Sequence, residues 1–372
     1  MKTLFIVPDL LQAEGGIARM MRLYLKAGCE LAAPGDEVRY AALSDSGDTF
    51  ARARAFLGER LTGLDNCARS KLRFLLVVLW RGRKADRIIC GHLHHLILAR
   101  FAAVFRPGVK YYLIAHGIEV WRPYSILERA ALRGAHRILC VSEYTRRQML
   151  RFAPFLDPAR LLVVPNTFDP AFASPRVATA PAGETHHSRI LVVSRLVATD
   201  PYKGVDTMIE AMPGILRQFP SAQLRIAGGG DDRPRLEEIA RTLGLGRAVH
   251  FTGIIDDAAL RTEYMACDIF ALPSRKEGFG LVYLEAMTYG KPCLAARAGG
   301  APEVVNPEVG ALVEYGNTDQ IAVAVADLVR HPRTPAAMLR RAGDFAFPVF
   351  KQRLSAALVA EGNEGKAGLT GR

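Results

Sequence analysis

Residues 272–285 read L-P-S-R-K-E-G-F-G-L-V-Y-L-E. A Pro-Ser turn opens this stretch, Gly278 and Gly280 allow a tight or left-handed backbone, and the apolar run that follows predicts a helix. The free N–H groups at such a helix start favour an anion such as a pyrophosphate. Glu277 on the loop and Glu285 in the helix are eight positions apart, so both carboxylates are expected to face one cleft. The stretch outlines a nucleotide-sugar site.

The string around this stretch is far more specific than a pair of glutamates, which chance supplies often. Residues 273–292 read P-S-R-K-E-G-F-G-L-V-Y-L-E-A-M-T-Y-G-K-P, and residues 298–305 read A-G-G-A-P-E-V-V. Together they resemble the Glu-x7-Glu signature of the retaining family-4 glycosyltransferases, of the bacterial polysaccharide-assembly type. The alternative interpretation is a solvated glutamate on a helix face beside glycines that only form turns.

Length and composition indicate a globular protein of two domains. The chain has 372 residues, of which 50% are hydrophobic and 23% charged, too many for one ordinary core. The apolar run Phe74–Trp80 is much shorter than the ~20 residues of a membrane-spanning helix. The N-terminus is interpreted as a first strand and not a signal peptide. The scattered cysteines, without a C-x-x-C, predict neither a disulfide framework nor zinc, and a cytoplasmic location is expected.

The positive charge lies almost entirely in the first half of the chain. The net charge is +12, with +11 over residues 1–170 and +1 over residues 171–372. This asymmetry predicts an anionic partner for the first half, such as a phosphorylated acceptor, an anionic membrane surface or nucleic acid. No helix-turn-helix, RNP-type strand or Cys/His finger is found, so nucleic acid is not expected.

The N-terminus predicts a strand, a glycine turn and a helix, which is the first unit of a doubly wound α/β domain. The strand covers residues 3–7, and the helix begins at Ile17 after Gly15 and Gly16. This glycine pair either forms a plain turn or lets the backbone approach a phosphate or the acceptor. It resembles the N-terminal glycine loop of the family. A second strand is expected at residues 37–43, followed by a polar loop at 44–50.

Residues 67–84, C-A-R-S-K-L-R-F-L-L-V-V-L-W-R-G-R-K, are basic at both ends and apolar between. One interpretation is a helix on an anionic membrane surface. The other, which the α/β order favours, is an ordinary packing helix before the next strand. Residues 91–95, G-H-L-H-H, invite a metal interpretation. Adjacent histidines do not easily face one ion, and no carboxylate or cysteine partner follows at ligand spacing, so no metal site is predicted here.

An apolar strand beginning at Tyr111 ends at His116-Gly117. Ligands of open α/β sheets bind at the carboxyl ends of parallel strands, so His116 is a candidate donor to a substrate hydroxyl or phosphate. The alternative is a structural histidine. The position also matches a cleft histidine of the family. Where the family usually has Asn-Gly, this chain has Asn166-Thr167, which puts a left-handed turn there in doubt.

The second domain restarts with a strand at residues 189–196, and Arg195 and Lys203 follow at its end. Lys203 is predicted to open the next helix. Breaking a sugar–phosphate bond leaves a diphosphate whose growing charge fixed cations stabilise. The two residues resemble the family's basic pair that grips this diphosphate, although A-T-D-P-Y lengthens the usual spacing. Ordinary solvated charges are the alternative. By resemblance, Gly228 and Gly229 border the nucleotide, and residues 251–256 present backbone groups to the base.

The resemblance implies an α/β protein of the GT-B fold, with two Rossmann-like doubly wound domains facing across a cleft. The domains are expected at residues 1–170 and 188–344, joined by a linker at 171–187. A C-terminal helix at about 345–360 is expected to pack back on the first domain, and 361–372 forms a tail.

The resemblance further implies a retaining hexosyltransferase, with mannose from GDP-mannose slightly favoured over glucose from a UDP-sugar. The acceptor is expected to be a lipid-linked saccharide in polysaccharide or lipopolysaccharide synthesis, reached from the inner face of the cytoplasmic membrane. A small soluble acceptor and a catalytically silent scaffold are the alternatives. No cofactor or metal is expected, because Arg and Lys take the cation's role. The expected catalytic residues are Glu277, Arg195, Lys203 and His116; the expected substrate-binding residues are Gly15, Gly16, Gly228, Gly229, Ile254, Gly278, Phe279, Gly280, Leu281 and Glu285.

Overall fold

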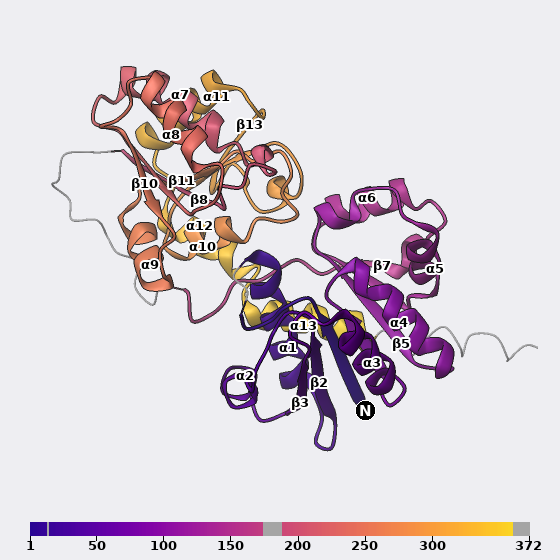
Figure 1. The fold of residues 1–372 in the computed structure, drawn as a ribbon. Helices are drawn as coiled ribbons and strands as arrows, with labels where there is room; N and C mark the ends of the chain where they lie inside the picture. Colours follow the sequence, from indigo (N-terminus) through magenta and orange to yellow (C-terminus); the bar gives the residue numbers. More distant parts are fainter. Residues whose placement is uncertain (13–14, 174–187, 360–372) are drawn as a thin grey trace, which may run out of the picture. The chain divides into compact units, whose positions relative to one another are not determined.

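The computed structural model describes residues 1–12, 15–173 and 188–359 (Figure 1). Contacts divide the chain into two compact units: residues 1–167 together with 347–372, and residues 168–346. Most of the predicted linker and all of the predicted tail lie outside the described residues. Each unit is built on a parallel sheet, as the alternation of strand and helix patterns predicts.

The first unit contains a seven-stranded parallel sheet in the order β3-β2-β1-β4-β5-β6-β7. Its strands are β1 Lys2–Val7, β2 Glu37–Ala42, β3 Leu61–Asn66, β4 Arg87–Cys90, β5 Lys110–Ala115, β6 Arg137–Cys140 and β7 Leu161–Val163. Side chains alternate between the faces, so Leu4 and Ile6 of β1 join one core. Phe5 points to the other face, where its ring lies so close to Gly28 that a Cβ there would be 2.9 Å away. Both faces are therefore covered by helices.

Several elements of this unit were not predicted, among them the helix α2 (Phe50–Leu57) and the strand β3. They follow the predicted polar loop at 44–50, in a stretch for which the sequence predicts no element. The segment L-T-G-L-D-N contains Gly63 and Asp65, which are poor strand formers. Pairing with β2 makes it a strand, from Val38 opposite Leu61 to Ala42 opposite Asn66. The tertiary context overrides the local preference.

The helices α3, α4, α5 and α6 share one buried core. In addition to α2, the helices of this unit are α1 Gly16–Leu31, α3 Lys71–Gly82, α4 Leu93–Phe105, α5 Ile126–Gly134, α6 Glu143–Phe152 and α13 Phe347–Val359. The last, α13, packs against α1: the rings of Tyr24 and Phe350 meet edge to face at 4.8 Å, and Lys351 Nζ lies 2.7 Å from Glu30 Oε2. The C-terminal helix thus belongs to the first unit.

The sequence put a left-handed turn at Asn166-Thr167 in doubt. The backbone φ of both residues is not positive, so neither is left-handed.

The second unit contains a six-stranded parallel sheet in the order β10-β9-β8-β11-β12-β13. Its strands are β8 Arg189–Val193, β9 Gln223–Ala227, β10 Val249–Gly253, β11 Ile269–Leu272, β12 Cys293–Ala296 and β13 Gly310–Val313. Its helices are α7 Val205–Gln218, α8 Arg233–Thr242, α9 Asp257–Ala266, α10 Leu281–Thr288, α11 Thr318–Arg330 and α12 Pro335–Gly343. The strand order reverses between β8 and β11. This is the topological switch point, at whose carboxyl end open α/β sheets bind ligands.

Candidate functional site

The loops that leave the two strands at the switch point carry the predicted site residues. Lys203 comes from the loop after β8, and Glu277 from the loop after β11. Lys203 Nζ lies 2.9 Å from Glu277 Oε2, and their side chains are only 20% and 15% exposed. Residues 74 positions apart in the sequence therefore form one charge pair.

Backbone contacts lock the two loops together. The Arg275 N–H donates to the Tyr202 carbonyl at 2.8 Å, and a Cβ at Gly204 would lie 2.6 Å from the Pro273 carbonyl oxygen. The prediction that Lys203 opens a helix is wrong. Lys203 ends a single 3-10 turn, Pro201–Lys203, and α7 begins only at Val205. The reason is Gly204, whose left-handed backbone (φ 71°) separates the two elements.

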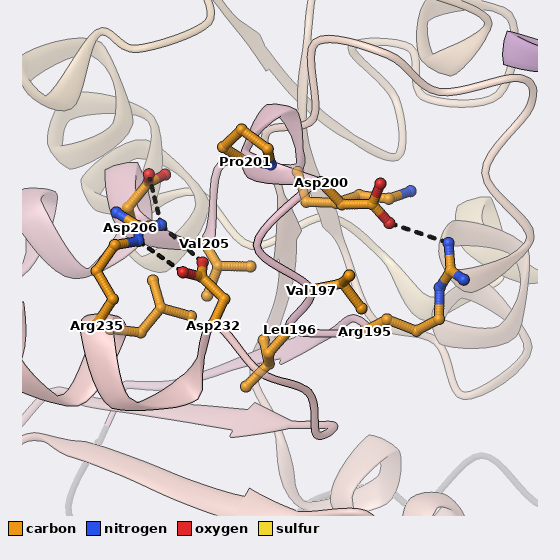
Figure 2. Close-up of a pocket in the computed structure, with 11 residues that line it drawn as sticks. Arg195, Leu196, Val197, Asp200, Pro201, Val205, Asp206, Asp232 and Arg235 are labelled. Atoms are coloured by element: carbon orange, nitrogen blue, oxygen red, sulfur yellow. Dashed lines mark hydrogen bonds and ion pairs between the residues drawn. The ribbon is translucent and has the colours of Figure 1, made fainter.

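The inserted residues before Lys203 hold Arg195. Arg195 Nη2 donates to Asp200 Oδ2 at 3.0 Å, and the Tyr202 hydroxyl donates to Asp200 Oδ1 at 2.8 Å. Figure 2 shows this Arg195–Asp200 pair at one side of a pocket. The sequence interpretation treated the insertion only as a spacer and missed Asp200. An acidic residue a few positions from a candidate phosphate-binding arginine was the available signal.

The pocket at this loop contains both predicted diphosphate-binding cations. Its opposite side carries an acidic pair held by one arginine: Arg235 Nε lies 2.7 Å from Asp232 Oδ1, and Arg235 Nη2 lies 3.3 Å from Asp206 Oδ2 (Figure 2). The lining residues are Arg195, Leu196, Val197, Asp200, Pro201, Lys203, Val205, Asp206, Asp232, Arg235 and Leu236. Neither of the predicted glutamates lines it.

The Gly228–Gly230 run lies directly against the strand end that carries Arg195. Gly228 and Gly230 have φ of +140° and +154°, and a Cβ on either would lie within 2 Å of the carbonyl oxygen of Ser194 or Leu196. Bulkier residues would push the two loops apart. Ile254 is 82% exposed, and its side chain borders Gly229. These glycines have a structural role, whatever they contact in a complex.

A second glycine pair fixes the backbone of the Glu277 loop. The Gly300 N–H donates to the Glu277 carbonyl at 2.7 Å, and a Cβ at Gly299 would lie 2.4 Å from the same oxygen. Gly280 adopts a left-handed conformation (φ 96°) as the N-cap of α10. Phe279 is buried and meets Phe345 edge to face at 5.3 Å. The start of α10 at Leu281 is thereby held in place.

The two predicted carboxylates have different partners. Glu285 lies on α10 and is buried, and its Oε2 accepts a hydrogen bond of 3.0 Å from the Tyr264 hydroxyl. The Tyr264 ring stacks on Tyr289 at 5.6 Å. Glu277 thus lies beside a cation and Glu285 beside a phenol.

In the first unit, His116 lies at the carboxyl end of β5 and is buried. Burial, and secondarily His92, lowers the pKa of His116 to about 4, so the ring is neutral at physiological pH. Its Nε2 has no partner among the described residues. The backbone N–H of His116 donates to Glu119 Oε1 at 2.6 Å, and burial raises the pKa of Glu119.

The free energy of unfolding of the first unit is expected to depend on pH, because three of its histidines have lowered pKa values. Burial lowers the pKa of His92 to about 4 and of His95 to about 3, as it does for His116. A lowered folded-state pKa contributes stability above the unfolded value of about 6.5, and that stability is lost as pH falls towards the folded value. The first unit is expected to lose on the order of a few kcal/mol between about pH 6.5 and pH 4.

Urea unfolding of the full chain at a series of pH values measures this loss. His95→Gln should flatten the pH dependence, since glutamine does not titrate. His331→Gln is the control, because His331 is exposed in the second unit. An unchanged slope for His95→Gln contradicts the prediction.

The loop between β1 and α1 is anchored by Asp45. Its carboxylate accepts backbone N–H groups from Leu10, Leu11 and Gln12 at 3.2, 3.0 and 3.3 Å, and its side chain is buried. Gly15 then forms the N-cap of α1, and Gly16 is the first residue of that helix. The sequence interpretation placed Asp45 in a polar loop and missed it. An aspartate at the carboxyl end of a parallel strand was the signal.

Across the described residues, no group of three or more His, Cys, Asp or Glu side chains is arranged to hold a metal ion. The adjacent histidines have separate roles: His92 accepts from the His94 N–H as the N-cap of α4, His94 is exposed, and His95 packs on Phe74. All six cysteines are buried free thiols. Among the described helices, none combines the length and apolarity needed to cross a membrane.

Comparison with known proteins adds the family. Residues 15–172 match the model described as Glycosyltransferase Family 4, and residues 183–344 match the model described as Glycosyl transferases group 1. A GDP-mannose-dependent alpha-(1-6)-phosphatidylinositol monomannoside mannosyltransferase of Mycolicibacterium smegmatis is 35% identical over 76% of this chain and 75% of its own. The chain belongs to the family-4 glycosyltransferases. Another member, a GDP-mannose-dependent monoacylated alpha-(1-6)-phosphatidylinositol monomannoside mannosyltransferase of Corynebacterium glutamicum, is 32% identical over 69% of this chain and 71% of its own.

Solved structures place this family-4 glycosyltransferase in the GT-B fold. HepE of Anabaena, solved with UDP and glucose, has a TM-score of 0.76 at 21% identity over 97% of this chain and 100% of its own. Sucrose-phosphate synthase of Thermosynechococcus elongatus has a TM-score of 0.76 at 21% identity over 96% and 98%. The predicted fold class, two Rossmann-like α/β sheets of the GT-B type, is confirmed.

Proposed function

We propose that this glycosyltransferase moves a hexose from a nucleoside diphosphate sugar to an acceptor hydroxyl, with retention of configuration at the anomeric carbon. The observation that carries this proposal is the Lys203–Glu277 pair beside Arg195 at the switch point of the second sheet. It combines cations for a diphosphate with a carboxylate for sugar hydroxyls, on loops that backbone contacts hold together.

The donor is proposed to be GDP-mannose in preference to UDP-glucose. The relatives at 35% and 32% identity are named as GDP-mannose-dependent mannosyltransferases. HepE, which was solved with UDP and glucose, is only 21% identical. Residues that recognise the base contribute mainly backbone groups, so the closer sequence relationship is the better guide to the donor.

Each site residue then has a chemical role. Arg195 and Lys203 stabilise the negative charge that grows on the leaving diphosphate, the role that a divalent cation fills in other enzymes. Glu277 binds donor-sugar hydroxyls and Glu285 the ribose. The acceptor oxygen bonds to the anomeric carbon on the face from which the diphosphate departs, and the acceptor proton passes to a phosphate oxygen. His116, neutral because burial lowers its pKa, assists near the reacting face as a hydrogen-bonding group.

The acceptor is proposed to be a lipid-linked saccharide in cell-surface polysaccharide or lipopolysaccharide synthesis, met at the inner face of the cytoplasmic membrane. Two observations support a lipid-borne acceptor. The relatives named above act on phosphatidylinositol mannosides by name. The excess of positive charge lies in the first half of the chain, where electrostatic attraction to an anionic acceptor or surface would act.

A thermal-shift panel of nucleotides and nucleotide sugars, without added metal, tests the donor site. A ligand at about 100 Kd stabilises the folded state by about 2.7 kcal/mol, which raises Tm by about 5–10 °C for a unit of this size. GDP or GDP-mannose is expected to produce this shift. Arg195→Ala and Glu285→Ala should abolish it, and Arg247→Ala, at an exposed arginine of the same unit, should not. No shift with any nucleotide would overturn the proposed function.

A further inference from the structure

The helix α3 carries two apolar stripes on opposite sides. Phe74, Val78 and Gly82 are buried against the core of the first unit. Leu72, Leu76 and Trp80 are exposed. Positions four apart line one side of a helix, and an offset of two positions is about 200° of rotation. The outer stripe therefore points away from the sheet, where an ordinary packing helix carries polar residues.

The neighbouring helix α4 extends this apolar surface. Phe101, Val104 and Phe105 are exposed at its C-terminal half. The two helices lie side by side (Figure 1): a Cβ at Gly82 would lie 2.7 Å from the Cβ of Ala102. The buried sides of both helices pack into the same core. Their exposed sides therefore face the same direction.

These six residues form what we call the α3–α4 face: Leu72, Leu76, Trp80, Phe101, Val104 and Phe105. Their exposed fractions lie between 46% and 68%. Single exposed apolar residues are ordinary, but a cluster of six large ones on two adjacent helices marks a contact surface.

Basic residues border the α3–α4 face. Residues 66–118 contain ten Lys or Arg and one acidic residue, Asp86. Two of the ten are ion-paired: Arg106 with Asp86 at 2.7 Å and Arg81 with Asp65 at 2.9 Å. Lys84 Nζ lies 4.2 Å from the centre of the Trp80 ring. Lys71 and Arg73 are exposed at the start of α3. The surface thus combines insertable apolar side chains with an excess of positive charge.

We infer that the α3–α4 face docks the protein on an anionic lipid bilayer. Leucine, phenylalanine and tryptophan side chains enter the boundary between headgroups and acyl chains, while lysine and arginine contact anionic headgroups. Long basic side chains keep their charge at the polar level while their stems cover apolar surface. A protein partner would satisfy the apolar residues without explaining the one-sided charge. The inference rests on the proposed function only in that a lipid-linked acceptor gives the docking a purpose.

Sedimentation of the full chain with vesicles tests the inference. Vesicles of phosphatidylcholine with about one third phosphatidylglycerol are compared with phosphatidylcholine alone, at low and high salt. We expect binding to the anionic vesicles that salt weakens. Leu76→Asp and Trp80→Asp should each lower vesicle binding about tenfold or more. Val323→Asp, at an exposed valine on α11 of the other unit, should change it less than about twofold.

A variant with fewer charges and two further measurements, light scattering and the nucleotide thermal shift, complete the test. Lys71→Gln with Arg73→Gln should weaken anionic binding about fivefold for each residue. Equal binding by all variants, or no binding to anionic vesicles, overturns the inference. A dimer in light scattering that Leu76→Asp and Trp80→Asp dissociate, without vesicle binding, would assign the face to a second copy and also overturn it. The nucleotide thermal shift of the same variants is read separately, so failure of docking and failure of the donor site are distinguishable.

Discussion

Lys203→Met is expected to lower kcat by about 10²–10³-fold with little change in the fold. Removal of one group that stabilises transition-state charge typically has an effect of this size. Lys203 is mostly buried and 2.9 Å from Glu277, so water replaces its charge poorly. The loss should appear in kcat as well as in kcat/KM, because the diphosphate charge grows in the transition state. Transfer of radiolabelled mannose from GDP-mannose to a membrane extract of lipid acceptors measures it.

The neighbouring lysine provides the matched control. Lys276 is exposed on the same loop as Glu277, and Lys276→Met removes the same charge. It is expected to change kcat less than about threefold, and an equal loss in both variants would show that net charge alone matters. The double variant Lys203→Met, Glu277→Gln should be less impaired than the product of the single effects, since the two residues form one pair.

Gly228→Ala is expected to destabilise the second unit by about 4 kcal/mol or more. The new Cβ would lie 1.8 Å from the backbone carbonyl oxygen of Ser194, and Gly228 has a φ of +140°. The Ser194 oxygen belongs to the backbone and is not the end of a flexible side chain, so the backbone must shift. Tm of the second unit should fall by about 10 °C, at about 2–4 °C per kcal/mol. Calorimetry of the purified chain measures this.

Gly246→Ala is the control for this glycine. Nothing lies within 4 Å of a Cβ at Gly246, and its φ is not positive. Alanine there is expected to leave Tm within about 1–2 °C or raise it, because it restricts the unfolded chain. If Gly228→Ala left Tm equally unchanged, the close approach of β9 to the Arg195 loop would not hold in solution.

Both predictions concern the second unit, where glycines allow the close backbone contacts that position two loops. Glycines that follow β9 and β12 let backbones approach closely, and this approach sets the positions of two loops. Gly228 serves the Arg195 loop and Gly299 the Glu277 loop. A charged pair on loops would ordinarily be mobile and weak. Here the backbone contacts hold Lys203 and Glu277 in place without a ligand. Under the proposed function, this leaves less reorganisation to the transition state.

The sequence by itself determined the α/β class and the start of α10, and it predicted the charged candidates Arg195, Lys203, Glu277 and Glu285 for the site. These are local properties: the apolar run after Gly280 predicts the helix that begins at Leu281, and residue types limit the chemistry. It did not predict β3, since L-T-G-L-D-N has no strand preference of its own.

Only the tertiary structure decided which residues meet. Sheet order put β8 beside β11, and this made Lys203 and Glu277 neighbours although 74 positions separate them. The tertiary structure also pairs Glu285 with the Tyr264 hydroxyl and Arg195 with Asp200. Such pairings depend on strand order and on loop conformations fixed by long-range contacts, whose energies no local window of sequence contains.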